Sequence, residues 1–404
     1  MLTPRTLDQE KAAYSIIAAP CPSFGVCGGC ALQDLAYQDQ LSVKQQRINQ
    51  VLQGLDPSLQ VTLQGLEDPW RYRNKAELTF SRSEGRLTLG YHQEGSFWRV
   101  VDLDDCLLLP DPMAQTIRQV RALAQALGPP AYHPRTHDGF WRHLTVRYSR
   151  ATGQVMVCVT TTPGPRALMA QFAEALMARA HQVASVYWGI RSSIADVAEP
   201  EELIWLRGAA CLEEQVGNFR LAVRPFAFLQ PNSQQAHRLY ECVTRAVPPV
   251  SDGVAWDLYC GMGLVAFYLA PRFRTVYGID ASASNLESAV ANAARNGIDN
   301  VTFRLGRVED VLRNRRFWLQ EAKPSLVAVD PPRSGLHPRA LASIEAARPP
   351  HVAYLSCNVQ TLVRDLQLFR AGYPRYGVRQ LAAFDMFPHT NHVELFALLE
   401  REAR

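Results

Sequence analysis

The sequence has few of the features that mark membrane, secreted or polycationic proteins. It contains no uninterrupted run of about 18 apolar residues, which argues against a transmembrane helix. Its nine cysteines are too sparse in 404 residues for a disulfide scaffold. Lys and Arg number 42 against 38 Asp and Glu, which excludes a histone-like polycation but not a local basic groove. The N-terminal residues lack the apolar core of a secretory signal, so we expect a cytoplasmic protein without a membrane partner.

What is present is the composition of a globular protein, with 47% hydrophobic and 20% charged residues and no internal repeat. The length suggests two to three domains. The pattern along the chain predicts a lead-in at 1–20, a cysteine knot and helix at 21–60, a central α+β domain at 61–225, and an α/β domain at 226–404. No segment indicates a protein partner.

The central part alternates short apolar and polar runs, which indicates strands of antiparallel hairpins. These runs lie at 76–80, 87–91, 144–148, 155–159 and 183–188. Apolar residues at helical spacing predict helices at 34–53, 111–127 and 164–180.

From about residue 232 the pattern changes to helices that alternate with nearly continuous apolar strands, which is typical of a parallel sheet buried on both faces. The predicted strands lie at 254–258, 275–279, 301–305, 326–329 and 352–355, with a closing strand at 393–399.

The N-terminal cysteines are unusually close together. Cys21, Cys27 and Cys30 have C-x5-C-x2-C spacing, and the glycines among them let the backbone wrap closely. Three thiolates this near can converge on one metal centre, and Cys106 is the next cysteine along the chain. Four sulfurs suit zinc or an iron–sulfur cluster, and the spacing does not choose between them.

A second motif indicates a nucleotide-like ligand. The strand at 254–258 runs into a Gly261-x-Gly263 turn, and Asp280 ends the next strand, where an acid can bind a ribose. The third glycine of the dinucleotide fingerprint is missing, because Leu264, Val265 and Ala266 follow Gly263. This favours S-adenosylmethionine over a nicotinamide cofactor.

Reactive side chains follow two further strands. Asp330 begins an Asp-Pro-Pro-Arg segment, and Cys357 follows the strand at 352–355. Both positions lie at the carboxyl end of the predicted sheet, where such sheets bind ligands. Cys357 is therefore a candidate nucleophile. Glu394 stands at the start of an apolar strand, where a carboxylate needs a partner or a function.

Six segments in this order resemble the RNA uridine-5-methyltransferases, specifically the iron–sulfur branch acting on 23S ribosomal RNA. They are the cysteine knot, Phe228-Leu-Gln230-Pro-Asn, Asp257-Leu-Tyr-Cys-Gly-Met-Gly263, Asp330-Pro-Pro-Arg, Ser-Cys357-Asn and Phe387-Pro-His-Thr-Asn-His-Val-Glu394. The resemblance runs from about Cys21 to Glu400. It implies a Rossmann-like class I methyltransferase domain at 226–404, dependent on S-adenosylmethionine, behind an N-terminal α+β domain that carries an iron–sulfur site. The central α+β domain at 61–225 would bind RNA.

The resemblance also implies roles for individual residues. Cys357 would be the nucleophile that attacks a uracil, and Glu394 the base. The S-adenosylmethionine pocket would be lined by Gln230, Tyr259, Asp280 and Asp330. A 4Fe-4S cluster would be held by Cys21, Cys27, Cys30 and Cys106. The implied partner is 23S rRNA.

This chain departs from the family pattern at two positions. Leu264 stands where relatives often have Asn or Gly, and Arg307 stands near the adenine contact where Asp or Asn is frequent. Many relatives also carry an N-terminal β-barrel RNA-binding module of some 60 residues. Only 20 residues precede Cys21, so we expect that module to be absent.

Three groups of basic residues are candidate RNA contacts, because cations beside aromatics bind phosphate and stack bases. They are Arg71, Arg73 and Lys75; Arg142, His143, Arg147 and Arg150; and Arg304, Arg307, Arg313, Arg315 and Arg316.

The main interpretation is a 23S rRNA (uracil-5-)-methyltransferase that works through a covalent Cys–uracil intermediate. The alternatives are the same chemistry on tRNA, a nicotinamide oxidoreductase, and a metal-bearing RNA-binding protein without catalysis. Family members acting on tRNA tend to lack the cysteine knot, which disfavours the first alternative.

Overall fold

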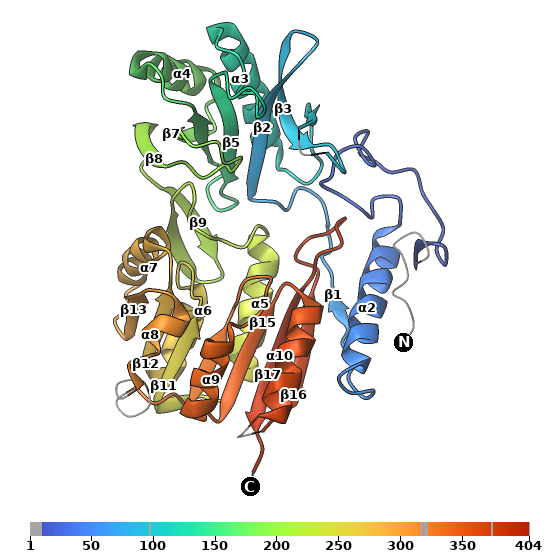
Figure 1. The fold of residues 1–404 in the computed structure, drawn as a ribbon, viewed down its shortest axis with the longest axis vertical. Helices are drawn as coiled ribbons and strands as arrows, with labels where there is room; N and C mark the ends of the chain where they lie inside the picture. The colour runs from blue at the N-terminus through green and yellow to red at the C-terminus, as the bar shows by residue number, and fades with distance from the viewer. Residues whose placement is uncertain (1–9, 97, 316–317, 319–321, 373–374, 404) are drawn as a thin grey trace.

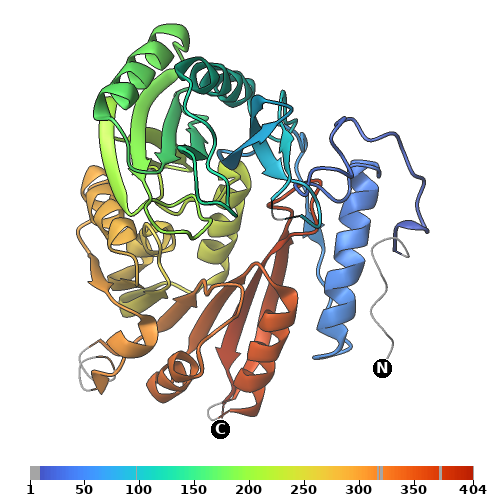
Figure 2. The same ribbon diagram turned by 45° about the horizontal axis from the view of Figure 1, so that its top comes forward.

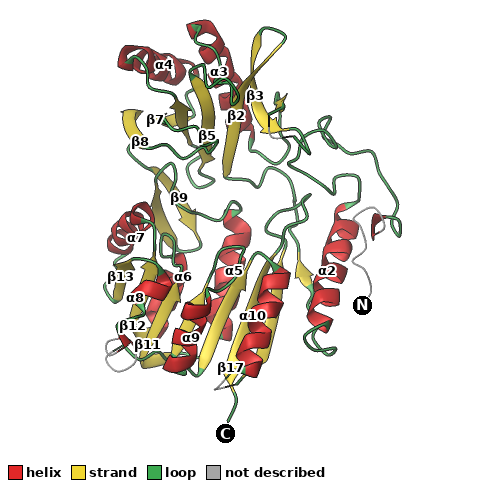
Figure 3. Ribbon diagram, viewed as in Figure 1, coloured by secondary structure: helices red, strands yellow, loops and turns green. Residues whose placement is uncertain are grey.

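A computed structural model of the chain describes residues 10–96, 98–315, 318, 322–372 and 375–403. Two sheets form two lobes, one above the other in Figure 1. Helices cover the lower sheet on both faces, whereas the upper sheet carries its helices on one side (Figure 3). None of the described helices is long and apolar enough to cross a membrane.

The lower sheet has eight strands in the order β1-β16-β17-β15-β14-β11-β12-β13. The five adjacent strands from β15 to the edge strand β13 are parallel, and β17 runs antiparallel to both of its neighbours. The strands are β1 (Leu63–Gln64), β11 (Val250–Leu258), β12 (Phe273–Asp280), β13 (Val301–Leu305), β14 (Leu326–Val329), β15 (His351–Ser356), β16 (Tyr376–Phe384) and β17 (Glu394–Arg401).

Alternate residues of each strand enter different cores, because successive side chains point to opposite faces. Ala255 packs on one face, and Trp256 on the other. The first face is covered by α5 (Ser233–Ala246), α6 (Leu264–Leu269) and α7 (Ala283–Arg295). The second is covered by α2 (Tyr37–Gln53), α8 (Val308–Val311), α9 (Pro338–Ala347) and α10 (Val359–Ala371). A short 3-10 helix, η1 (Ala270–Arg272), precedes β12. The predicted parallel α/β sheet is confirmed.

The upper sheet has seven strands in the order β4-β3-β2-β5-β6-β7-β8. They are β2 (Lys75–Ser83), β3 (Arg86–His92), β4 (Val100–Asp102), β5 (Trp141–Tyr148), β6 (Val155–Thr161), β7 (Val183–Ile190) and β8 (Glu202–Gly208). The helices α3 (Asp111–Leu127) and α4 (Arg166–Arg179) pack together on one face. Contrary to the expectation of hairpins throughout, β6 and β7 are parallel, because α4 carries the chain back between them.

Two segments near the predicted boundaries pack with the lower sheet. Helix α2 and β1 join its core, with Ile48, Leu52 and Leu63 among the buried residues. A two-stranded hairpin, β9 (Leu212–Val216) and β10 (Phe219–Val223), contributes Leu221 and other apolar side chains to the opposite core. Figure 2 shows α2 beside the C-terminal strands. The division into the four predicted segments itself stays a prediction.

Candidate functional site

Most of the predicted site residues lie at one edge of the lower sheet. Tyr259, Asp330 and Cys357 each follow directly after a parallel strand, and Asp280 ends another. Glu394 begins the antiparallel strand β17, which places it at the same edge. Ligands of open α/β sheets bind outside the carboxyl ends of the parallel strands, so the topology brings these side chains to the expected binding edge.

The turn after β11 depends on unusual backbone conformations. Tyr259, Gly261 and Gly263 all have positive φ, at 63°, 54° and 85°. A side chain at Gly263 would place its Cβ 2.8 Å from the Phe303 ring, so only glycine fits there. Leu264 begins α6 and is buried in the adjoining core. This residue, where the sequence departs from the family, therefore packs into the core and also borders the cavity beside the turn.

Asp280 fixes this turn. Its carboxylate accepts hydrogen bonds from the backbone N–H of Gly261 at 2.9 Å and of Ser282 at 2.8 Å. The Nδ2 of Asn285 donates to it at 3.3 Å. The carboxylate is thus held beside the glycine turn, at the end of the strand next to β11, where an acid can meet the hydroxyls of a ribose.

A cavity at this edge joins three of the predicted residues. Gln230, from the segment before α5, lines it together with Tyr259 and Asp330. The other lining residues are Phe228, Leu229, Tyr240, Asp257, Cys260, Gly261, Met262, Leu264 and Val265. Burial raises the pKa of Asp330 to about 7, so a cation in this cavity would favour its ionised form.

Asp257 lines the same cavity, and the sequence analysis did not single it out as a site residue. It is fully buried, and one carboxylate oxygen accepts the N–H of Ala266 at 2.9 Å. The other oxygen has no partner among the described residues, and burial raises the pKa of this carboxyl. The sequence did contain a sign of this role, because Asp257 is an acid within an otherwise apolar strand and a buried acid needs a partner.

Arg307 forms an ion pair within its own turn. It precedes α8, and its guanidinium contacts the buried Glu309 carboxylate at 2.6 Å. Both residues line a second cavity, which Tyr259 and His337 also border. The ion pair accounts for an arginine at this departure from the family pattern.

Cys357 and Glu394 meet on neighbouring strands. Ser356 of β15 pairs with Leu395 of β17, so the residues just beyond that pair lie side by side. Burial raises the pKa of the Cys357 thiol, and the nearby Glu394 and Asp330 carboxylates raise it further. Glu394 is 2% exposed, and its pKa is raised by burial and by Asp330. A thiol thus lies next to a carboxyl of raised basicity, an arrangement suited to nucleophilic attack followed by proton removal.

Asn358 and Arg333 complete this corner. The Asn358 side chain caps α10 by accepting the N–H of Gln360 at 3.0 Å, and its Nδ2 donates to the Arg333 carbonyl at 3.2 Å. The positive charge of Arg333 acts in the opposite direction to burial. It lowers the pKa values of Cys357 and Glu394, because it favours their ionised forms. Asn358 thereby connects the turn that contains Cys357 to the Asp-Pro-Pro-Arg segment that begins at Asp330.

The loop that leads to Glu394 is held by a buried ion pair. The Lys44 Nζ lies 2.6 Å from the Asp385 carboxylate, and both side chains are at most 1% exposed. Lys44 also donates to the carbonyl of Phe387 at 3.0 Å. The Tyr37 hydroxyl donates to the second Asp385 oxygen at 2.9 Å. Helix α2 therefore determines the path of the chain into β17.

His389 links the same loop to the cysteine segment. Its backbone carbonyl accepts the N–H groups of Ala31 and Leu32 at 2.9 and 3.0 Å. Its ring stacks on Trp70 with centroids 3.7 Å apart, and burial lowers its pKa to about 4. His389 is thus a neutral, buried structural histidine.

Replacing Lys44 with methionine is expected to lower the free energy of unfolding by about 3–5 kcal/mol, because Asp385 then keeps a buried charge without its partner. Denaturant unfolding followed by circular dichroism measures the change. The control Arg379→Met removes an ion pair whose side chains are about half exposed, and should cost at most about 1 kcal/mol. A Lys44→Met protein as stable as that control would contradict the assigned role. The double variant Lys44→Met/Asp385→Leu should recover most of the loss.

The four predicted metal ligands line one small cavity. Cys21, Cys27, Cys30 and Cys106 border it together with Arg73. Burial and the neighbouring cysteines raise the pKa of Cys30 to about 12 and that of Cys106 to about 11, whereas Arg73 lowers that of Cys106. Within the described ranges, no three or more His, Cys, Asp or Glu side chains have the arrangement of a metal site. The structure brings the thiols together but does not confirm the metal.

Two members of the second basic group are buried and are not exposed RNA contacts. Arg147 is buried and donates through Nε to the carbonyl of Pro225 at 2.7 Å. Arg142 is equally buried, and it donates to the carbonyls of Ser193 and Ala195 at 2.7 and 2.8 Å. The prediction was wrong for these two residues because their guanidinium groups satisfy backbone carbonyls. Of the third group, Arg316 lies outside the described residues.

The glycine turn, the acid after the second strand and the cavity between them define a class I methyltransferase fold. The family profile described as tRNA (Uracil-5-)-methyltransferase matches residues 216–402. An uncharacterized RNA methyltransferase of Caldanaerobacter subterraneus subsp. tengcongensis is 35% identical over 399 residues, which cover 97% of this chain and 86% of that protein. Another, from Halalkalibacterium halodurans, is 33% identical over 403 residues, covering 98% and 86%. The chain belongs to the RNA (uracil-5-)-methyltransferase family.

A solved structure is similar over almost the whole chain. The Pyrococcus abyssi tRNA (uracil-54, C5)-methyltransferase, in complex with S-adenosyl-L-homocysteine, superposes with a TM-score of 0.76 at 27% sequence identity. The match covers 92% of this chain and 84% of that one. The methyl donor of the family is therefore S-adenosylmethionine, as the sequence analysis predicted.

Proposed function

We propose that this protein transfers a methyl group from S-adenosylmethionine to carbon 5 of a uridine in 23S rRNA. We favour 23S rRNA over tRNA as the substrate because four cysteines surround one cavity. Relatives that act on tRNA tend to lack the cysteine knot. The chemistry itself is supported by the adjacency of Cys357 and Glu394 at the carboxyl edge.

In the proposed reaction the Cys357 thiolate forms a bond to carbon 6 of the uracil. The electron pair displaced from the ring double bond makes an enolate, whose carbon 5 takes the methyl group. The sulfonium of S-adenosylmethionine supplies that methyl and leaves as a neutral thioether. Glu394 then removes the proton from carbon 5, the double bond re-forms, and the thiolate is expelled.

The remaining site residues hold the donor in this proposal. Gln230, Tyr259 and Asp330 line its cavity, and Asp280 stands at the strand end beside the glycine turn. The buried carboxyl of Asp330 suits a cationic sulfonium, because a positive charge offsets its desolvation. Reciprocally, the bound cation is expected to lower the pKa values of Asp330 and Glu394.

Methylated-nucleoside mapping in a strain without this gene tests the substrate. We expect one or more 5-methyluridines to disappear from 23S rRNA and to return with the intact gene, while those in tRNA persist. Loss of a 5-methyluridine from tRNA alone would favour the second candidate. That candidate is supported by the similarity to the Pyrococcus abyssi tRNA enzyme.

We also propose that Cys21, Cys27, Cys30 and Cys106 hold a 4Fe-4S cluster. Four thiols that converge on one cavity are the donor set that such a cluster requires, and the nearby Arg73 favours their thiolate forms. Bound there, the cluster would supply a structural cross-link and no redox step. It would fasten the cysteine segment, which contacts His389 in the loop before Glu394.

Protein purified without oxygen is expected to show a broad visible charge-transfer band, with about four iron atoms and four labile sulfides per chain. Cys30→Ser should lose most of this band and its iron. The control Cys242→Ser changes a half-buried cysteine outside the cavity and should keep both. A colourless wild-type protein that contains one zinc ion would contradict the cluster, as would an unchanged spectrum in Cys30→Ser.

A further inference from the structure

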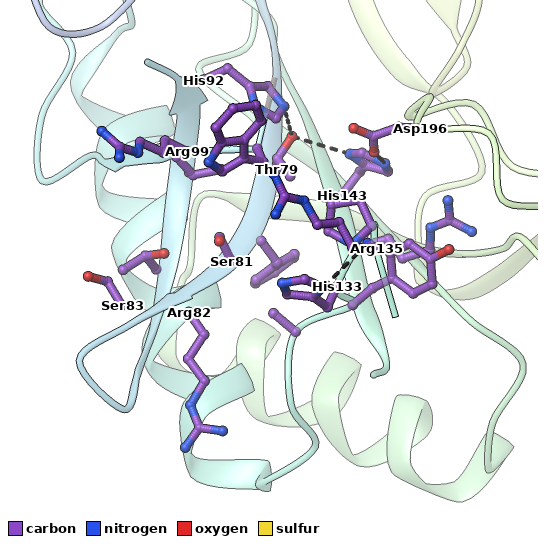
Figure 4. Close-up of a pocket in the computed structure, with 18 of the residues that line it drawn as sticks. Thr79, Ser81, Arg82, Ser83, His92, Arg99, His133, Arg135, His143 and Asp196 are labelled. Carbon is purple, nitrogen blue, oxygen red and sulfur yellow. Dashed lines mark hydrogen bonds and ion pairs between the residues drawn. The ribbon is translucent and has the colours of Figure 1, made fainter. Parts of the chain in front are cut away.

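A deep hollow in the upper lobe has no part in the proposed chemistry. It opens on the face of the seven-stranded sheet that α3 and α4 do not cover. On β2, Leu78 and Phe80 pack in the core beneath those helices. Thr79 and Ser81 alternate with them along the strand and therefore face the hollow. Figure 4 shows Thr79 and Ser81 among the labelled side chains of this hollow. Its walls come from β2, β3, β5 and the loops around residues 98 and 133.

The hollow is rich in positive charge. Arg82, Arg99 and Arg135 line it, all three are exposed, and none forms an ion pair with a described residue. Asp196 is the one carboxylate among the described lining residues, and it is engaged with His143 at 3.1 Å. Three cations without an acidic partner in the described part of the chain make this surface suited to an anion such as a phosphate group.

Flat side chains stand beside these cations. The Trp98 side chain is 42% exposed, and the Arg135 guanidinium lies 4.9 Å from the centre of its ring. Deeper in the hollow, the buried Arg142 guanidinium lies 4.1 Å from the ring centre of Tyr132 and supports that ring from within the wall. Aromatic and guanidinium planes next to phosphate-binding cations are the surfaces on which single-stranded bases stack.

Polar atoms on the walls lack partners. Buried atoms of Thr88, His92 and Arg142 (Oγ1, Nδ1 and Nε) have no hydrogen bond to any described residue. The Thr79 hydroxyl meets the Nε2 of His92 at 3.2 Å and the Nδ1 of His143 at 3.5 Å. Such unpaired groups are costly when buried, and they make the wall of the hollow polar.

The hollow is connected to the cofactor cavity by a single strand. Just before β2, the Nδ2 of Asn74 donates to the carbonyl of Gln230 at 2.8 Å and to the Ser233 hydroxyl at 2.9 Å. Thr79 lies four residues after Lys75 on that strand, or roughly 13 Å along it. The hollow is therefore separated from the wall of the cofactor cavity by a short stretch of strand, a spacing suited to another nucleotide of the same RNA.

We propose that this hollow binds an RNA nucleotide other than the one that is methylated. The arginines hold its phosphate, and the base stacks at Trp98 and Arg135. This inference rests on the proposed function, since the bound nucleotide belongs to the same RNA as the target uridine.

The test compares two double variants of matched charge. Arg99→Ala/Arg135→Ala removes two cations of the hollow, and Arg166→Ala/Arg179→Ala removes two exposed cations of α4, on the opposite face of the sheet. Each is assayed with the RNA that the wild-type protein methylates, at several salt concentrations, and with a short oligonucleotide that contains only the target uridine and its nearest neighbours.

For the hollow variant we expect the dissociation constant for the full RNA to rise about tenfold or more, with a salt dependence shallower by about one to two units of slope. Turnover at saturating RNA and activity on the short oligonucleotide should stay within about twofold of wild type. Trp98→Leu should weaken binding of the full RNA about tenfold without changing the salt slope, because it removes stacking and no charge.

Equal RNA affinity and salt slope in the hollow and α4 variants would overturn the inference, and so would equal losses on the short and full substrates. A wild-type protein that methylates neither 23S rRNA nor tRNA would instead contradict the proposed function. The two failures are therefore distinguishable.

Discussion

Cys357→Ala protein is expected to release no 5-methyluridine while it still binds S-adenosylmethionine and RNA. Without the thiol, carbon 6 has no nucleophile and carbon 5 is not activated, so the rate should fall on the order of 10⁴-fold or more, as is typical when an enzymic nucleophile is removed. The side chain is half-buried and small, so alanine should leave the fold intact. Methyl transfer from labelled S-adenosylmethionine measures the rate.

The control for this experiment is another cysteine that is about as buried but lies elsewhere. Cys242 on α5 is half-buried and lines none of the described cavities, so Cys242→Ala should retain activity within about twofold. Full turnover by Cys357→Ala would contradict the covalent mechanism. Lost turnover together with lost binding of S-adenosylmethionine would instead indicate a damaged pocket.

Glu394→Gln protein is expected to accumulate a covalent complex with RNA that survives denaturation. Attack by Cys357 and methyl transfer do not need this carboxylate, but removal of the carbon 5 proton does, so the thiol cannot leave. Turnover should fall about 10²–10⁴-fold. Electrophoresis under denaturing conditions should show a slow-moving band that contains protein, RNA and the transferred methyl group.

Glutamine suits this test because it resembles the protonated acid that burial already favours at Glu394. The matched control is Glu400→Gln on the same strand, where the carboxylate is about half exposed and contacts Arg379 at 2.6 Å. That control should turn over normally and trap nothing. A Glu394→Gln protein that turns over like Glu400→Gln would contradict the role of Glu394 as base.

Strands with a strong local pattern were predictable. Those at 254–258, 326–329 and 352–355 are continuous apolar runs because helices cover both sides of them, and the structure places strands there. Strand β16 was missed because Arg379 and Gln380 are exposed and interrupt its apolar pattern. Strand β1 was missed because two residues carry no periodicity, and its pairing with Ala383 and Phe384 depends on residues 320 positions away.

The residues of the candidate site were likewise predictable only in part. Residues that follow a strand, such as Asp330 and Cys357, were found because topology alone brings strand ends together. The Lys44–Asp385 pair was missed, since 341 residues separate its members and neither has a local motif. The second basic group was misread because only the tertiary structure shows that Arg147 points at backbone carbonyls.

The pairing of β1 with β16, together with the contacts of α2, has a consequence for biosynthesis. The apolar side of α2 and the edge of β1 meet their partners only after the chain beyond residue 376 has been made. Until then Lys44 has no counterion, and Ala31 and Leu32 cannot reach the carbonyl of His389. The cysteine segment pairs early with residues 92–94, but its end at Ala31 and Leu32 is fixed only when the last strands have been made. Ribosome-bound chains that stop short of β16 should therefore leave α2 and this end of the segment more open to proteases than the complete chain does.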